Sequence, residues 1–106
     1  MKKILLACAG GFSTSMLVER MQESAKKKGI TVEIDASAVS RIAPEIDNIS
    51  IILLGPQMGH NEGKLKKEYG HKVPITTINS MDYGMMDGEK VLTQALALIE
   101  DFKGGS

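Results

Sequence analysis

The chain has 106 residues, of which 42% are hydrophobic and 25% are charged, values typical of one globular domain. Its thirteen basic and thirteen acidic residues cancel, and it contains no tryptophan, two tyrosines and two phenylalanines. A neutral chain with so few aromatic side chains argues against a nucleic-acid-binding protein, which normally has a basic excess and stacking platforms.

The N-terminal segment does not match a signal peptide or a membrane anchor. After Lys2 and Lys3 the apolar run spans only about five residues, whereas a secretory signal needs roughly 7–15 and a membrane span ~20. The single cysteine, Cys8, cannot form an internal disulfide, and a lone thiol suits a reducing compartment. We therefore predict a cytoplasmic protein.

The first third of the chain predicts a strand, a helix and a second strand. Residues 3–8 are mostly apolar on consecutive positions, which is typical of a strand buried on both faces. Residues 17–25 carry apolar side chains at helical spacing, and Gly29 follows a lysine run that suits a helix C-terminus. Residues 30–35 alternate apolar and polar side chains, which predicts a strand at a sheet edge.

The middle of the chain predicts two further strands. Residues 37–48 carry only a weak pattern, and Pro44 limits any helix there to a short one. Residues 49–54 form a second fully apolar strand, residues 59–70 a modest helix and residues 73–78 a fourth strand.

The C-terminal part predicts one long helix. Asp87 is expected to cap it, and its apolar residues fall on one broad stripe. We assign residues 1–103 to a single domain and residues 104–106, Gly-Gly-Ser, to a flexible tail. The stripe consists of Val91, Leu92, Ala95, Leu98, Ile99 and Phe102.

The alternation of strands with helical segments indicates an α/β fold, a parallel sheet with helices on both faces. Right-handed crossovers and two fully apolar central strands favour the flavodoxin-like order 2-1-3-4. Ligands of such sheets bind beyond the carboxyl ends of the strands where the order reverses, here between the first and third strands. We therefore expect the loop after Cys8 to lie beside the turn Gly55-Pro56-Gln57.

The loop after the first strand combines a thiol with features of an anion site. The Gly10-Gly11 pair allows close approach of the backbone, and residues 13–15 supply hydroxyl groups at a helix start. Free backbone N–H groups and the helix dipole bind anions there, and they favour thiolate over thiol. These residues suit a tetrahedral oxyanion held against the sulfur of Cys8, with phosphoryl transfer onto and off that sulfur.

The spacing also invites comparison with the Cys-x5-Arg-Ser/Thr loop of cysteine phosphatases. Thr14 stands where those enzymes have the arginine that clamps the phosphate. Without that bidentate fork the loop should bind free phosphoesters weakly. We therefore expect protein partners to deliver and remove the phosphoryl group.

Three motifs together resemble a known family. They are Cys8-Ala9-Gly10-Gly11-Phe12-Ser13-Thr14-Ser15-Met16-Leu17, then Leu53-Leu54-Gly55-Pro56-Gln57, then Asp82-Tyr83-Gly84 followed by Asp87-Gly88. In this order and over nearly its whole length, the chain resembles the enzyme IIB component of the bacterial phosphoenolpyruvate-dependent sugar phosphotransferase system, in its lactose/cellobiose/chitobiose class.

The resemblance implies a phosphotransferase that works through a phosphocysteine. The phosphohistidine of enzyme IIA would pass its phosphoryl group to Cys8. Cys8 would then phosphorylate a β-linked disaccharide such as cellobiose, chitobiose or lactose, bound by the membrane component enzyme IIC. The protein would associate peripherally with that transporter as a monomer, with no cofactor, metal or nucleic acid.

The resemblance also assigns residues around Cys8. The phosphate-binding loop would be Ala9, Gly10, Gly11, Phe12, Ser13, Thr14 and Ser15, and the rim would be Gly55, Pro56, Gln57 and Tyr83. Phe12 takes a loop position that often holds methionine or another apolar residue. Asp82 stands where an apolar residue is common.

Two alternatives belong to other classes. A low-molecular-weight cysteine phosphatase or arsenate reductase-like hydrolase would share the loop length and could use Asp82 as its general acid, but Thr14 replaces the arginine. A non-catalytic flavodoxin-like binding module would lack the chemistry altogether. His60 and His71 are eleven residues apart, with no Cys or carboxylate at ligand spacing, and we interpret them as surface residues.

Overall fold

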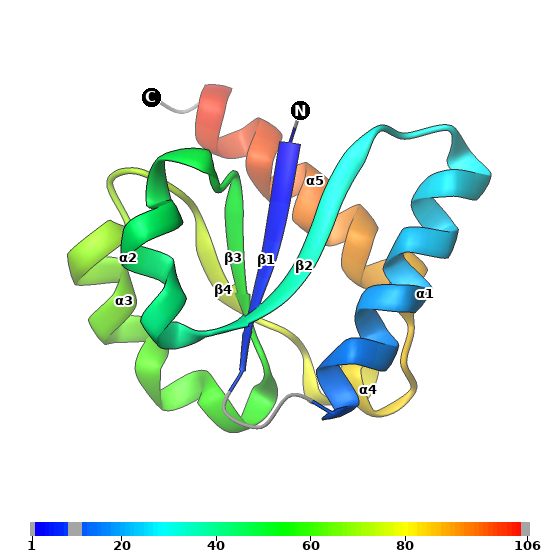
Figure 1. Ribbon diagram of the computed structural model, residues 1–106, viewed down its shortest axis with the longest axis horizontal. Coiled ribbons are helices and arrows are strands. Elements are labelled where there is room, and N and C mark those ends of the chain that lie inside the picture. The colour runs from blue at the N-terminus through cyan, green and yellow to red at the C-terminus, as the bar shows by residue number, and fades with distance from the viewer. Residues whose placement is uncertain (1, 9–11, 105–106) are drawn as a thin grey trace.

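The computed structural model describes residues 2–8 and 12–104, without the side chains of residues 8, 12–14, 103 and 104. The helices and strands in chain order are β1 (Lys2–Cys8), α1 (Phe12–Lys28), β2 (Val32–Ala38), η1 (Val39–Arg41), α2 (Ile42–Glu45), η2 (Ile46–Asn48), β3 (Ile51–Leu54), η3 (Pro56–Asn61), α3 (Glu62–Tyr69), β4 (Ile75–Thr77), α4 (Ser80–Gly84) and α5 (Gly88–Gly104). Figure 1 shows their arrangement.

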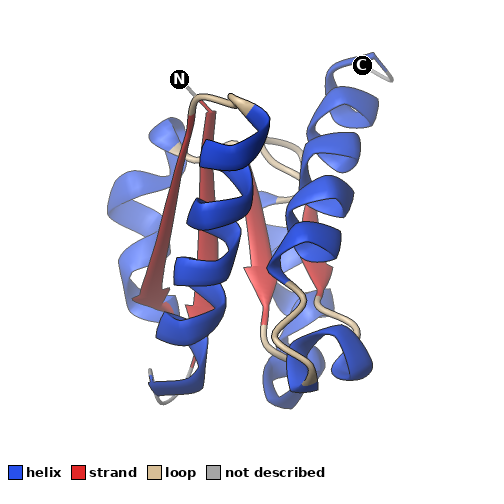
Figure 2. Ribbon diagram, turned by 90° about the vertical axis from the view of Figure 1, so that its right-hand side faces the viewer, coloured by secondary structure: helices blue, strands red, loops and turns tan. Residues whose placement is uncertain are grey.

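The four strands form one parallel sheet in the order β2-β1-β3-β4, so the expected topology is confirmed. The strand arrows in Figure 2 all point toward the same edge of the sheet, which we call the carboxyl edge. The register places Ala7 opposite Leu54, and Leu54 opposite Thr77. Three strands therefore end at nearly the same level, as a binding site at the carboxyl edge requires.

Helices cover both faces of the sheet, because the central strands are apolar on both sides. Along β1, Ile4 and Leu6 pack in the core beneath α1 and α5, whereas Leu5 and Ala7 pack in the core on the opposite face. Figure 2 shows α1 and α5 in front of the sheet, with the green helices of Figure 1 behind it. β1 and β3 are thus the buried centre that the sequence predicts.

The end of α1 follows from a glycine. Gly29 has a φ of +69°, a left-handed conformation that L side chains rarely adopt. The N–H of Ile30 donates to the carbonyl of Ala25 (2.9 Å), and that of Gly29 donates to the carbonyl of Lys26 (3.2 Å). These are the two bonds of a Schellman motif, and they confirm Gly29 as the helix stop.

Several expected boundaries shift. The apolar strand over residues 49–54 begins at Ile51, and the strand over 73–78 is shortened to Ile75–Thr77. Pro74 precedes that strand, and its carbonyl accepts a bond from the N–H of Ile52 (3.0 Å). The helix expected over 59–70 divides into η3, which begins at a proline, and α3.

The last helix begins as predicted. The Asp87 carboxylate accepts a bond from the N–H of Lys90 (3.1 Å). In the apolar stripe, Val91, Leu92, Ala95 and Ile99 are buried, whereas Leu98 and Phe102 are half-buried. The helix runs to Gly104, and residues 105 and 106 lie outside the described part of the chain. Within the described residues, none of the helices combines the length and hydrophobicity needed to cross a membrane.

Candidate functional site

Cys8 is the last residue of β1, at the carboxyl edge, and its backbone pairs with that of Ala38 in β2. α1 begins at Phe12, so the segment between them connects a strand to a helix N-terminus, as expected. Residues 9–11 of the predicted phosphate loop lie outside the described residues. The side chains of Cys8 and of residues 12–14 do so as well, while Ser15 is exposed in the first turns of α1.

The Gly55 turn lies next to the end of β1. The N–H of Gly55 donates to the carbonyl of Ala7 (3.5 Å), so the turn after β3 lies beside the end of β1. The loop after Cys8, which we expect beside this turn, lies outside the described residues at positions 9–11. Gly55 is buried, and a Cβ atom there would lie 3.0 Å from Oε1 of Gln57 and 3.1 Å from Nε2. The Gln57 side chain therefore folds back over the turn, in space that only glycine leaves open.

η3 follows this turn and is held at both ends. Pro56 occupies its first turn, and the N–H of Met58 donates to the carbonyl of Gly55 (2.8 Å). At the other end, Thr77 Oγ1 donates to Glu62 Oε1 (2.7 Å), and Lys66 Nζ lies 3.1 Å from Glu62 Oε2. The Thr77 hydroxyl, followed by Lys66, holds the pKa of Glu62 below its ordinary value.

A short helix that the sequence reasoning missed, α4, also lies at the carboxyl edge, as Figure 2 shows. The Asn79 side chain caps it by accepting bonds from the N–H groups of Met81 (2.8 Å) and Asp82 (3.4 Å). An asparagine followed three positions later by an acidic residue is a helix-start signal that could have predicted α4. Tyr83, predicted for the rim, is half-buried in α4 and packs against the core beneath α1 and α5.

Asp82 is buried, with 5% of its surface exposed, and Lys90 Nζ lies 3.4 Å from its Oδ1. Its carbonyl accepts a bond from the N–H of Asp87 (3.0 Å). The carboxylate therefore joins α4 to the start of α5. Asp82 therefore has a structural role at this turn.

The histidines do not belong to a cluster. His60 and His71 are both exposed, in agreement with their interpretation as surface residues. Over residues 2–8 and 12–104, no group of three or more His, Cys, Asp or Glu side chains is placed to hold a metal ion.

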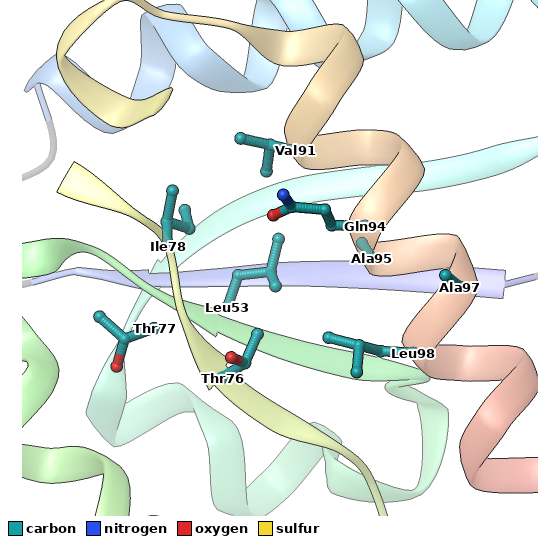
Figure 3. A pocket seen from close by; sticks show the side chains of 9 residues that line it. All are labelled: Leu53, Thr76, Thr77, Ile78, Val91, Gln94, Ala95, Ala97 and Leu98. Carbon is teal, nitrogen blue, oxygen red and sulfur yellow. The ribbon is translucent and has the colours of Figure 1, made fainter. Parts of the chain in front are cut away.

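An apolar groove of about 310 Å³ lies between β4 and α5 (Figure 3). Its floor is Leu53 and Ile78, and Leu98 and Gln94 reach over it from α5. The groove exists because β4 is the outermost strand and α5 packs mainly against α1. Among the described residues, none that lines the groove is a predicted site residue.

Comparisons with known proteins agree on one family. Residues 3–94 match the family model described as PTS system, Lactose/Cellobiose specific IIB subunit. The chain is 41% identical over 100 residues to the PTS system oligo-beta-mannoside-specific EIIB component of Bacillus subtilis, covering 93% of this chain and 97% of that protein.

A solved structure and a longer relative are also similar to this chain. The solution structure of the cellobiose-specific phosphotransferase IIB component protein of Borrelia burgdorferi is 42% identical, with a TM-score of 0.80 over 94% of this chain and 93% of that one. The PTS system lactose-specific EIICB component of Lacticaseibacillus casei is 31% identical over 77 residues, which are 70% of this chain and 13% of that protein.

Proposed function

This chain belongs to the lactose/cellobiose-specific IIB family of the sugar phosphotransferase system, and we propose that it carries the phosphoryl group on Cys8. One observation carries the assignment. The chain's cysteine ends β1 at the carboxyl edge where the strand order reverses, directly before the helix N-terminus of α1. No other cysteine exists in the chain to take this role.

The first step is transfer from a phosphohistidine to the thiolate of Cys8. The sulfur attacks phosphorus, an S–P bond forms and the N–P bond breaks. The electron pair of that bond remains on the imidazole nitrogen, which then takes up a proton. Backbone N–H groups of residues 9–15 would neutralise the oxygens of the transferred group in place of the arginine that Thr14 replaces.

The second step returns the phosphoryl group to an oxygen. A sugar hydroxyl attacks phosphorus, an O–P bond forms, the S–P bond breaks and the Cys8 thiolate is regenerated. The hydroxyl proton leaves to water or to a base of the acceptor complex. Both steps exchange one bond to phosphorus for another, so neither consumes an oxidant or a cofactor.

The proposed donor is enzyme IIA and the proposed acceptor is a sugar bound by enzyme IIC. The relative named as an EIICB component supports the second partnership, since it contains a segment similar to this chain within a longer protein. We also place the protein in the cytoplasm, in peripheral contact with enzyme IIC. For the sugar we propose a β-linked disaccharide, because the matching family is named for lactose and cellobiose and the Bacillus subtilis relative for oligo-beta-mannosides.

The rim residues have a positioning role in this proposal. Gly55 keeps the turn against β1, and Gln57 folds over it, so this segment would limit the space beside the phosphorylated sulfur. Tyr83 would border the site from α4. A monomer suffices for all of these roles.

The deciding measurement is the mass of the intact protein after incubation with phosphoenolpyruvate, the general phosphotransferase proteins and an enzyme IIA of this class. Wild type should gain one phosphoryl group, and Cys8→Ser should gain none. The group should be lost on addition of enzyme IIC and a β-linked disaccharide. Turnover of p-nitrophenyl phosphate without an adduct would instead support the cysteine phosphatase.

A further inference from the structure

α4 and the residue that directly follows it present two methionines to solvent. Met81 is 70% exposed and Met85 is 72% exposed, and they are four positions apart. The N–H of Met85 donates to the carbonyl of Met81 (3.0 Å), so the helical turn that brings both side chains onto one face is formed. A single exposed apolar side chain needs no explanation, but two of this size on one short helix form a patch.

The orientation of α4 is fixed by contacts on its inner side. Asn79 caps the helix, and the buried Asp82 lies 3.4 Å from Lys90 Nζ in α5. Met86, directly after Met85, has a φ of +53° and packs against the core. A left-handed methionine costs about 1–2 kcal/mol, which the surrounding contacts must offset. The outward position of the two methionines is therefore built into the fold.

The same segment offers no accessible charge. Within residues 79–86 the only Asp, Glu, Lys, Arg or His is Asp82, which is buried and lies 3.4 Å from Lys90 Nζ. A partner that contacts α4 therefore meets apolar sulfur-containing side chains and small neutral groups. The part of the partner's surface that meets the two methionines would therefore be mainly apolar, with the exposed amine of Lys90 beside it.

The register places α4 close to Cys8. Ala7, Leu54 and Thr77 are neighbours across three adjacent strands, and strands lie about 4.8 Å apart. The end of β4 is therefore about 10 Å from the end of β1, and α4 begins three residues after Thr77. A small transient interface covers about 600 Å² on each partner, which corresponds to a disc of about 14 Å radius.

We propose that Met81 and Met85 form part of the surface on which the phosphohistidine-bearing donor protein docks. The inference rests on the proposed function, because direct transfer to Cys8 requires the donor to cover the carboxyl edge. A footprint of the size above, centred on Cys8, extends past the end of β4 toward α4, which also lies at the carboxyl edge. Methionine suits such a contact, since its flexible side chain adapts to the partner without a fixed complementary shape.

The test uses the double variant Met81→Gln/Met85→Gln, with the rate of phosphoryl uptake measured against donor concentration. The apparent KM for the donor should rise roughly tenfold, with kcat unchanged, as expected for lost docking contacts. The variant Met81→Leu/Met85→Leu should stay within about twofold of wild type, because it keeps the apolar surface. Thermal unfolding checks that each variant folds.

Ala97→Gln is the matched control. Ala97 is exposed on α5, nine residues beyond the start of that helix and so about 14 Å along it from the carboxyl edge. Its KM should equal that of wild type. The docking proposal would be wrong if the KM for the donor were unchanged in the glutamine double variant, or if it rose equally in the leucine double variant. Either result would leave the carrier function intact. Failure of wild type to accept phosphate would overturn both.

Discussion

Thr77 Oγ1 donates a 2.7 Å hydrogen bond to Glu62 Oε1, and this bond joins the last residue of β4 to the first residue of α3. The methyl group of Thr77 also lies against η3, 3.5 Å from where a Cβ of Gly59 would be. One threonine thus holds the segment that carries Pro56 and Gln57 beside the Cys8 site.

Removing that hydroxyl tests how strongly the segment is held. Thr77→Val keeps the shape of the side chain but leaves Glu62 without its neutral donor, so stability should fall by about 1 kcal/mol. Thr93→Val is the matched control, because its hydroxyl donates to the carbonyl of Glu89 on the exposed face of α5. Urea unfolding measures the stability of both variants. An equal loss of stability in the two would show that the Thr77 hydrogen bond contributes no more than an exposed one.

The acid dependence of stability should contain a contribution from Glu62. Its pKa is lower in the folded protein than the ordinary 4.5, first because Thr77 donates to its carboxylate and then because Lys66 is near. The carboxylate therefore contributes stability above that value and loses it as the pH falls through the folded pKa. The difference in unfolding free energy between wild type and Glu62→Gln should shrink below about pH 4.5.

The control for this pH experiment is Glu23→Gln, at an exposed position of α1. Its difference from wild type should vary less across the same range. A Glu62→Gln difference that grows toward acid pH would have the wrong sign and would contradict the hydrogen-bond assignment.

Gly88 should tolerate no side chain. A Cβ there would lie 2.5 Å from the carbonyl carbon of Arg20 and 2.6 Å from the N of Met21, both backbone atoms of α1. Gly88→Ala should therefore push α5 from α1 and cost about 1–3 kcal/mol. Gly63→Ala, at an open position in α3, should stabilise by about 0.5–1 kcal/mol because alanine favours the helix.

Chemical denaturation measures the change in unfolding free energy for Gly88→Ala and for Gly63→Ala. Opposite signs are expected, since the substitution is the same and only the surroundings differ. A neutral Gly88→Ala would mean that the two helices separate without loss, contrary to their tight contact.

Asp82 should matter for the junction of α4 and α5. Asp82→Ala removes a buried carboxylate that Lys90 contacts, while leaving Lys90 exposed enough to be solvated, so we expect a loss of about 1–2 kcal/mol. Glu100→Ala is the control, because its pair with Lys2 lies largely in solvent and should contribute under 1 kcal/mol. Thermal unfolding of both variants measures the difference.

The fold could be predicted from the sequence because the strongest signals in the sequence are local. Apolar runs at residues 3–8 and 49–54 indicated the two central strands, and Gly29 and Asp87 marked helix ends through their own chemistry. The strand order then followed from the handedness of the crossovers. Each of these predictions uses a pattern of residues that are close together in the chain, combined with a general rule of protein structure.

The features that escaped prediction depend on tertiary contacts. α4 is only five residues long; its Asn79 cap is a local signal that the sequence offered, but the burial of Asp82 becomes evident only when α5 folds beside it. The hydrogen bond that holds the start of α3 comes from Thr77, which is fifteen residues away from Glu62 in the chain. Hydrophobic periodicity cannot predict such contacts between residues that are far apart in the chain.

Within the candidate site, the topology predicted that the turn after Leu54 lies beside the end of the first strand, and the bond from Gly55 to Ala7 agrees with that placement. The assignments of Cys8, of residues 9–15 and of Pro56, Gln57 and Tyr83 stay predictions that the phosphorylation experiment addresses. The half-burial of Tyr83 against the core was not foreseen, because the sequence motif gives its position along the chain but not the packing of its ring.

The two ends of the described chain lie at the edge of the sheet opposite Cys8, as Figure 1 shows. β1 runs from Lys2 to Cys8, so the two edges of the sheet are about 20 Å apart along this strand. A linker or further domain joined at either end would begin at the edge of the sheet opposite Cys8. It would therefore not block a partner protein that approaches Cys8. The same fold can therefore work as a separate protein or as one module of a fused polypeptide, with no change to its reactive side.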